Sequence, residues 1–106
     1  MNEPTYFTLA SLLDGPLHGY GIVKRASELS GGRVRIAAGT LYGVLDRLRE
    51  QGLVSEEGQE IVDGRARRSY RLSAAGEAAL TAEAARMQAA ARVVRSRRPV
   101  AKASPA

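Results

Sequence analysis

Residues 39–54 read GTLYGVLDRLREQGLV, and this stretch decides the fold. Four of its apolar residues recur at the spacing of one buried helix face: Leu41, Val44, Leu45 and Leu48. Thr40 is a suitable N-cap residue at the start of this pattern. At its end, Gly52 stands where a left-handed C-terminal cap is favoured, and Leu53 can fold back onto the helix. The spacing therefore predicts a helix between Thr40 and Gly52.

A β-hairpin is predicted directly after this helix. The polar residues 54–62 lead to Asp63-Gly64, a pair that favours a tight hairpin turn, and residues 65–72 form the returning strand. Tyr70 and Leu72 share one face of that strand, so Tyr70 is expected in the core. The other face is expected to be exposed and carries Arg67, Ser69 and Arg71.

Two further helices are predicted upstream. Thr5 is expected to cap the first, and Asp14-Gly15-Pro16 ends it. Its buried face is expected to hold Tyr6, Leu9, Ala10 and Leu13. The second helix is expected over residues 19–29, with its inward positions at Ile22, Ala26 and Leu29. Gly19 and Gly21 each disfavour its first turn by roughly 1 kcal/mol, which indicates a close approach of another segment there. Residues 34–36 are long enough only for a short strand.

A last helix is predicted from Ser73, its N-cap, to about Val94. Apolar residues in it recur alternately four and three apart, as in a short coiled coil: Leu80, Ala84, Met87, Ala91 and Val94. This seam has few large residues and little reason to be buried within so small a domain, so a second copy of the chain is its expected cover. Residues 95–106 are expected to form a disordered basic tail.

The order of these elements predicts a mainly α fold with a small β-hairpin. We expect a winged helix-turn-helix over residues 1–73 and a dimerisation helix over residues 74–94. In such a domain the third helix enters the major groove of DNA through its N-terminal residues, while the hairpin wing follows the backbone. Four wing arginines, with no acidic residue between Gly64 and Gly76, suit phosphate binding.

Candidate site residues follow from this arrangement. The expected DNA contacts are Tyr20, Gly39, Thr40, Tyr42, Gly43, Arg47, Arg65, Arg67 and Arg68. The expected dimer contacts are Tyr6, Leu9, Leu80, Ala84, Met87, Ala91 and Val94. Several of these contacts have an alternative. Tyr20 could pack against the third helix, and Tyr42 could be an ordinary core or surface tyrosine. The wing arginines could form a solvated charge run, and Arg47 could pair with Asp46 or Glu50.

Composition excludes several function classes. The chain of 106 residues suits one domain, has no cysteine and has His18 as its only histidine, so we expect no zinc or copper site. No nucleophile elbow, phosphate loop or cofactor fingerprint is present, and we expect neither an enzyme nor a bound cofactor. No apolar run approaches the ~18 residues of a membrane span, so we expect no membrane anchor and no signal peptide. We therefore expect a cytoplasmic location.

The net charge of +5 is concentrated at the C-terminal end. Five of the basic residues lie in positions 92–106, where there is no acidic residue, and residues 1–91 contain 11 basic and 11 acidic residues. Any basic DNA-facing surface on the body must therefore be local.

Three segments resemble the PadR-type transcriptional regulators, in matching order over roughly residues 5–80. His18-Gly19-Tyr20-Gly21-Ile22 resembles the family's second helix, and Gly39-Thr40-Leu41-Tyr42 with the residues up to Leu53 resembles its recognition helix. Residues 64–73 with Gly76 resemble its wing. The resemblance implies a homodimer that represses transcription at a palindromic operator and is released by a small molecule or another signal. The alanine-rich last helix, which has no aromatic residue, departs from the family pattern.

Two other functions use the same features. One is a winged helix that contacts protein rather than DNA, which would show no DNA shift. The other is a nonspecific nucleic-acid binder driven by the basic tail, which would lose nearly all affinity without residues 93–106.

Overall fold

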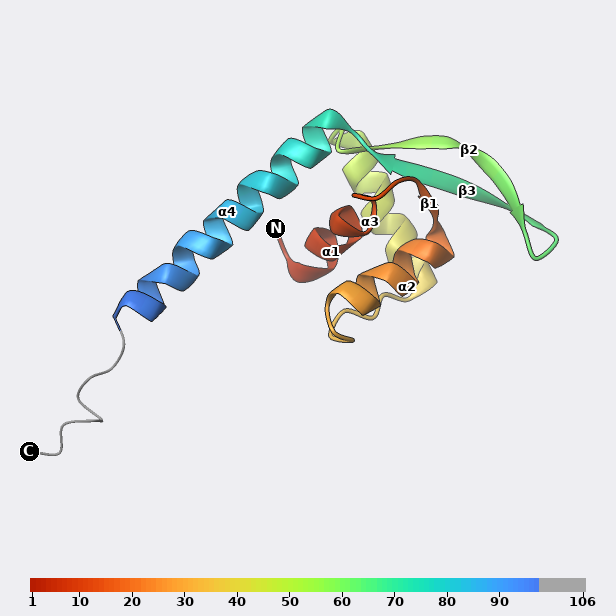
Figure 1. The fold of residues 1–106 in the computed structure, drawn as a ribbon. Helices are drawn as coiled ribbons and strands as arrows, with labels where there is room; N and C mark the ends of the chain where they lie inside the picture. Colours follow the sequence, from red (N-terminus) through yellow and green to blue (C-terminus); the bar gives the residue numbers. More distant parts are fainter. Residues whose placement is uncertain (98–106) are drawn as a thin grey trace, which may run out of the picture.

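Four helices and a three-stranded antiparallel sheet make up residues 1–97, the part of the chain that this computed structural model describes (Figure 1). In chain order the elements are α1 (Glu3–Ser11), β1 (Leu17–His18), α2 (Gly19–Leu29), α3 (Ala38–Glu50), β2 (Val54–Val62), β3 (Arg65–Leu72) and α4 (Ala74–Ser96). The predicted mainly α fold with a small β-hairpin is confirmed. Most of the predicted tail lies outside the described residues, and its first two positions, 95 and 96, are helical.

The hairpin of β2 and β3 forms as predicted. Asp63 and Gly64 both have positive φ, 53° and 77°, as a tight type I′ turn requires, and Val62 pairs with Arg65 across it. The strand β1 pairs with the other edge of β3, which gives the order β1-β3-β2. Figure 1 shows the hairpin extending from the helical body as a wing.

Helix α1 begins earlier than predicted. Asn2, and not Thr5, is its N-cap: the Asn2 side-chain oxygen accepts a hydrogen bond from the Thr5 backbone N–H at 2.9 Å. Proline fits the first helical turn because it lacks an N–H group that would need a partner there, so Pro4 lies inside α1. The helix ends at Ser11, and Leu13 beyond it is 56% exposed, which corrects its predicted burial.

Helix α3 also begins before its predicted cap. Its N-cap is Ala37, and the first backbone bond within the helix runs from the Leu41 N–H to the Ala37 carbonyl at 2.9 Å. Thr40 is therefore the third helical residue and caps nothing. The C-terminal prediction is confirmed, since Gly52 has φ +76° and the Leu53 N–H donates to the Leu48 carbonyl at 2.9 Å.

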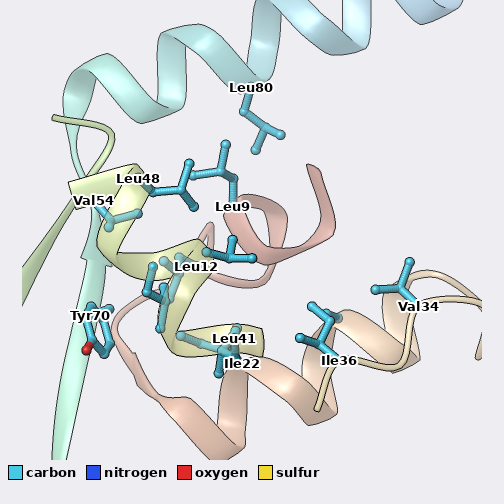
Figure 2. Close-up of a cluster of buried hydrophobic side chains, with 13 residues drawn as sticks. Leu9, Leu12, Ile22, Val34, Ile36, Leu41, Leu48, Val54, Tyr70 and Leu80 are labelled. Carbon is cyan, nitrogen blue, oxygen red and sulfur yellow. The ribbon is translucent and has the colours of Figure 1, made fainter. Parts of the chain in front are cut away.

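The core lies where α1, α2 and α3 meet the base of the sheet (Figure 2). The predicted stripe of α3 is buried throughout, as is Tyr70. Val34 and Ile36 are buried too, but they lie in the irregular connection between α2 and α3 rather than in the predicted strand. Leu29, at the last turn of α2, is 44% exposed and not inward as predicted.

Helix α4 is joined to the body only at its base. The Ser73 side chain caps it by accepting from the Gly76 N–H at 3.0 Å, and Leu80 points from α4 toward Leu9 and Leu48 (Figure 2). Beyond Ala84 every described residue of α4 is exposed, and Figure 1 shows the helix projecting away from the body. Among residues 1–97 no helix is long and apolar enough to cross a membrane.

Candidate nucleic-acid interface

The first two turns of α3 present a polar, open face. Gly39, Thr40 and Gly43 are exposed, and no atom lies within 4 Å of where a Cβ would stand on either glycine. Ala37 supplies no side-chain hydrogen bond to the helix start. The first N–H groups of α3 therefore lack a side-chain cap, and they form the positive end of the helix dipole.

Three of the predicted DNA contacts come together beside this helix start. Tyr20 from α2, Tyr42 from α3 and Arg67 from β3 line one cavity of about 190 Å³, together with Ala38, the first residue of α3. Arg67 is half-buried, not fully exposed as its strand face predicts. Its Nε atom is buried and has no hydrogen-bond partner among the described residues.

Tyr42 lies against the first residue of α2. Its hydroxyl occupies space next to Gly19, where a Cβ would stand only 2.7 Å from the oxygen. The close approach that the glycines of α2 predict is confirmed at this position. Tyr42 is 39% exposed, so its ring is held in place on one side and open to solvent on the other.

Tyr20 is the most exposed tyrosine of the site, at 65%. Its ring stacks on that of His18, with centroids 6.3 Å apart and an interplanar angle of 11°. His18 caps α2, because its Nδ1 accepts a hydrogen bond from the Gly21 N–H at 3.3 Å. The stacking partner of Tyr20 therefore comes from its own helix cap and not from α3.

The wing arginines divide into two kinds. Arg68 lies 3.5 Å from Glu56, and Arg71 donates to Glu57 at 3.2 Å, so β2 neutralises part of the charge of β3. No ion pair joins Arg65 or Arg67 to any described side chain. The local positive charge of the wing is therefore smaller than four arginines indicate. It is concentrated at the hairpin turn and at the cavity beside α3.

Arg47 lies on a different side of α3 from the tyrosine cavity. It lines a hollow of about 290 Å³ with Met1, Asn2 and Gln51. The predicted alternative, a pair with Asp46 or Glu50, is absent among the described residues; Arg49 instead lies 3.6 Å from Asp46 and also contacts Glu56.

Two basic residues near the site were not predicted from the sequence. Lys24 and Arg35 line a hollow of about 360 Å³ that also borders Tyr20. Lys24 follows Tyr20 by four positions, which places both on one face of α2, so helical periodicity contained this signal. Arg35 lies in the irregular segment before α3, where no periodicity exists.

Tyr70 lies behind the wing arginines in the core. Its burial, reinforced by the negative charge of Glu56, raises the pKa of its hydroxyl above 10.0. The phenol is therefore neutral at physiological pH. No group of three or more metal-ligating side chains occurs among the described residues.

The predicted dimer contacts also divide into two kinds. Leu9 is fully buried and Leu80 is 5% exposed, so both belong to the core of their own chain, which corrects their assignment as contacts with a partner. Met87 and Val94 are 43% and 72% exposed and have no cover among residues 1–97. Tyr6 and Ala84 are half-buried, intermediate between the core residues and the exposed residues of α4.

Comparisons with known proteins agree with this arrangement. Residues 8–82 match the transcriptional regulator PadR-like family. The chain is 44% identical over 81 residues to the transcriptional regulator Rv3488 of Mycobacterium tuberculosis, which covers 76% of this chain and 72% of the relative. A PadR family regulator from Eggerthella lenta superposes with a TM-score of 0.69 at 28% identity, over 87% of this chain and 78% of that one. Bacillus subtilis PadR, solved in complex with operator DNA, has the same fold, with a TM-score of 0.62 at 24% identity over 73% of this chain and 44% of that one.

Proposed function

Because this chain belongs to the PadR-like family of transcriptional regulators, we propose that it binds operator DNA as a homodimer and represses transcription there. One observation carries the DNA-binding part of the proposal. Tyr20, Tyr42 and Arg67 come from three separate elements and surround one cavity beside the uncapped start of α3. Such a convergence has no evident role in the core. It suits a phosphate backbone that passes between the wing and the recognition helix.

In this proposal α3 enters the major groove by its N-terminal end. Gly39 and Gly43 have open space where other residues carry side chains, so the helix can approach the bases closely. Thr40 is exposed toward the groove, and the helix dipole favours a phosphate near the helix start. Arg65 and Arg67 neutralise backbone charge along the wing, and Arg68 does so when it leaves Glu56.

The dimer of the proposal is formed by α4, with α1 completing the interface. The exposed seam of α4 supports this, because Met87 and Val94 have no other cover among the described residues. A two-fold dimer sets its recognition helices in successive major grooves, roughly 34 Å apart, and so reads an inverted repeat. Release from DNA by a small molecule completes the proposal and is supported by family membership alone.

The experiment that tests the proposal is fluorescence anisotropy with two labelled duplexes, the DNA upstream of the chain's own gene and a scrambled version. Both are titrated at several salt concentrations. We expect preference for the upstream duplex at all of them, with one dimer bound per site. Equal affinity for both duplexes that disappears as salt rises would indicate a charge-driven binder, and no binding to either would indicate a protein-contact module; both outcomes contradict the proposal.

A further inference from the structure

The wing is supported by another strand only at its base. Within the described residues, β1 pairs with β3 at Tyr70 and Ser69 alone, and no residue of β3 between Tyr70 and the turn is fully buried (Figure 1). Six positions separate Tyr70 from Gly64 in the turn, or about 20 Å of strand. Over that length, a tilt of about 10° at the base moves the turn by about 3.5 Å, the whole length of a long hydrogen bond. The position of the wing arginines relative to α3 therefore depends on what holds the wing where it leaves the body.

Glu56 lies at this point, opposite Tyr70, and contacts both α3 and β3. Its carboxylate pairs with Arg49 in the last turn of α3 and lies 3.5 Å from Arg68 of β3. The Glu56 side chain is 32% exposed, less than either arginine. Arg49 is also held by Asp46 at 3.6 Å, so its guanidinium lies between two carboxylates. Among the described residues, the pair of Glu56 with Arg49 is the one ion pair that joins the wing to the recognition helix.

A β-bulge directs Glu56 toward α3. The register that runs from the turn to Gln59 would, if it continued unchanged, place Glu56 opposite Arg71, on the face of β3 that points away from the core. The irregularity between Glu56 and Gln59 places Glu56 opposite the buried Tyr70 instead. Gly58 lies within the bulge and has φ +95°, a conformation that glycine adopts without steric cost. Bulges that redirect a side chain in this way are common beside functional sites.

We propose that Glu56 is a positioning residue for DNA recognition, which fixes the angle between the wing and α3 through Arg49; this rests on the DNA binding proposed above. Binding to one sequence needs α3 and the wing in place together, and a wing already held at the right angle is not ordered at a cost on binding. Nonspecific binding depends mainly on charge and gains nothing from a fixed angle. When Arg68 moves from Glu56 to a phosphate, Arg49 still compensates the carboxylate and still holds the wing. Glu56 therefore raises the preference for the operator, although its negative charge weakens binding to DNA in general.

Glu57 provides a matched control. It is the next residue of β2, and it also pairs with an arginine, Arg71, at 3.2 Å. Its side chain is 39% exposed, close to the value for Glu56. Arg71 belongs to the same hairpin and borders a hollow near the base of α4, so this pair does not join the wing to α3. Glu56→Gln and Glu57→Gln remove the same charge from neighbouring positions, and a difference between them reports the link to α3.

Anisotropy titrations of both variants with the upstream and scrambled duplexes test the effect on DNA recognition. We expect both variants to bind the scrambled duplex more tightly than the wild type does. We expect Glu56→Gln alone to lower the ratio of the two affinities, about twofold for each protomer or about fourfold for a dimer, because each protomer loses an exposed ion pair. In an Arg49→Gln background, Glu56→Gln should lower the ratio little further. A ratio that Glu56→Gln leaves unchanged, or that both variants lower equally, would overturn the positioning role, whereas a wild type without preference for either duplex would contradict the proposed function.

A distance measurement without DNA tests the link itself. The chain has no cysteine, so spin labels can be placed by Glu50→Cys in α3 and Ile61→Cys near the turn, two exposed positions. Labelled chain is diluted with unlabelled chain so that a homodimer adds no second distance. By pulsed electron paramagnetic resonance, we expect a broader distance distribution in Glu56→Gln and an unchanged one in Glu57→Gln. Equal distributions in the wild type and both variants would mean that the core alone holds the wing, and would overturn the proposal whatever the DNA titrations give.

Discussion

Replacement of Gly76 by alanine is expected to destabilise the protein more than the same change at any other described glycine. Gly76 lies in the first turn of α4, and a Cβ there would stand 2.0 Å from the Leu53 carbonyl oxygen and 2.8 Å from a methyl group of Leu72. The Leu53 carbonyl is not free to move, because it accepts the Ser73 N–H at 3.0 Å, and the Ser73 hydroxyl donates to the Gly52 carbonyl at 2.6 Å. Room for the methyl group therefore requires the base of α4 to separate from the end of α3.

The expected magnitude follows from three contributions. Overpacking of a close contact costs about 1–3 kcal/mol, and the loss of one or two hydrogen bonds at this junction adds about 0.5–1.5 kcal/mol each. Alanine is favoured over glycine in a helix by about 1 kcal/mol, which offsets part of this loss. These contributions span about 0.5–5 kcal/mol, and their midpoint is a loss of about 3 kcal/mol of unfolding free energy for Gly76→Ala, or roughly 12–24 °C in Tm for a domain of this size.

The assay is thermal and urea denaturation followed by circular dichroism, with all proteins at one concentration because the stability of the proposed homodimer would depend on it. Gly43→Ala is the matched control. Gly43 is also a helical glycine, but a Cβ there would meet no atom within 4 Å, so the change should stabilise by about 0.5–1 kcal/mol. Equal stability of Gly76→Ala and the wild type, or equal loss in both variants, would refute the reasoning.

Three further predictions concern the interface and α4. Gly19→Ala should leave the chain folded but displace the Tyr42 hydroxyl and weaken DNA binding. In a Tyr42→Phe background the added Cβ would lie 3.2 Å from the nearest ring atom, so Gly19→Ala should cause little further loss of DNA affinity. Additive losses of DNA affinity from the two changes would exclude this coupling. Arg67→Ala should weaken binding to all duplexes and lower the salt slope by about 1; an unchanged slope would exclude a phosphate contact by this residue. The hydrogen bond from Arg86 and its charge hold the pKa of Glu83 below 4.5, so Glu83 contributes stability that is present above that pH and is lost as pH falls through its folded pKa. The stability difference between the wild type and Glu83→Gln should therefore narrow in urea titrations as pH is lowered below 4.5, and a constant difference would contradict this.

The elements that sequence periodicity predicted correctly are those whose signals are local. The stripe of α3, the Gly52 cap and the Asp63-Gly64 turn each depend on residues a few positions apart, and the structure has all three. The predicted start of α3 was wrong, because the N-cap is Ala37 and not Thr40. Threonine is a favoured N-cap residue, and no local sequence signal indicated that the helix begins before it.

Features that depend on distant partners were not predictable in the same way. Strand β1 exists only because Leu17 and His18 pair with Tyr70 and Ser69, more than fifty positions away. Residues 34–36 show the opposite case: they alternate apolar and charged residues as a strand does, but they pair with no strand among residues 1–97. Neither outcome can be read from propensity, because a strand is defined by its neighbour.

The candidate site shows the same division between local and distant signals. The sequence placed four arginines on the wing, but only the structure shows that Glu56 and Glu57 neutralise Arg68 and Arg71 across the hairpin. The residues opposite each other in a hairpin depend on its register, and an irregularity between Glu56 and Gln59 alters that register beyond what the turn alone predicts.

The proposed function also has to work with few side chains that can read bases. The exposed start of α3 offers Thr40 and Tyr42 between two glycines, and its arginines lie only in later turns. Bidentate contacts from arginine, asparagine or glutamine are the strongest direct readers of base edges, and the first two turns of α3 contain none. The fixed distance between two recognition helices and the deformability of the DNA between them must therefore supply much of the specificity of such a dimer. The geometry in which two copies of the chain meet would therefore be part of how the proposed dimer distinguishes one site from another.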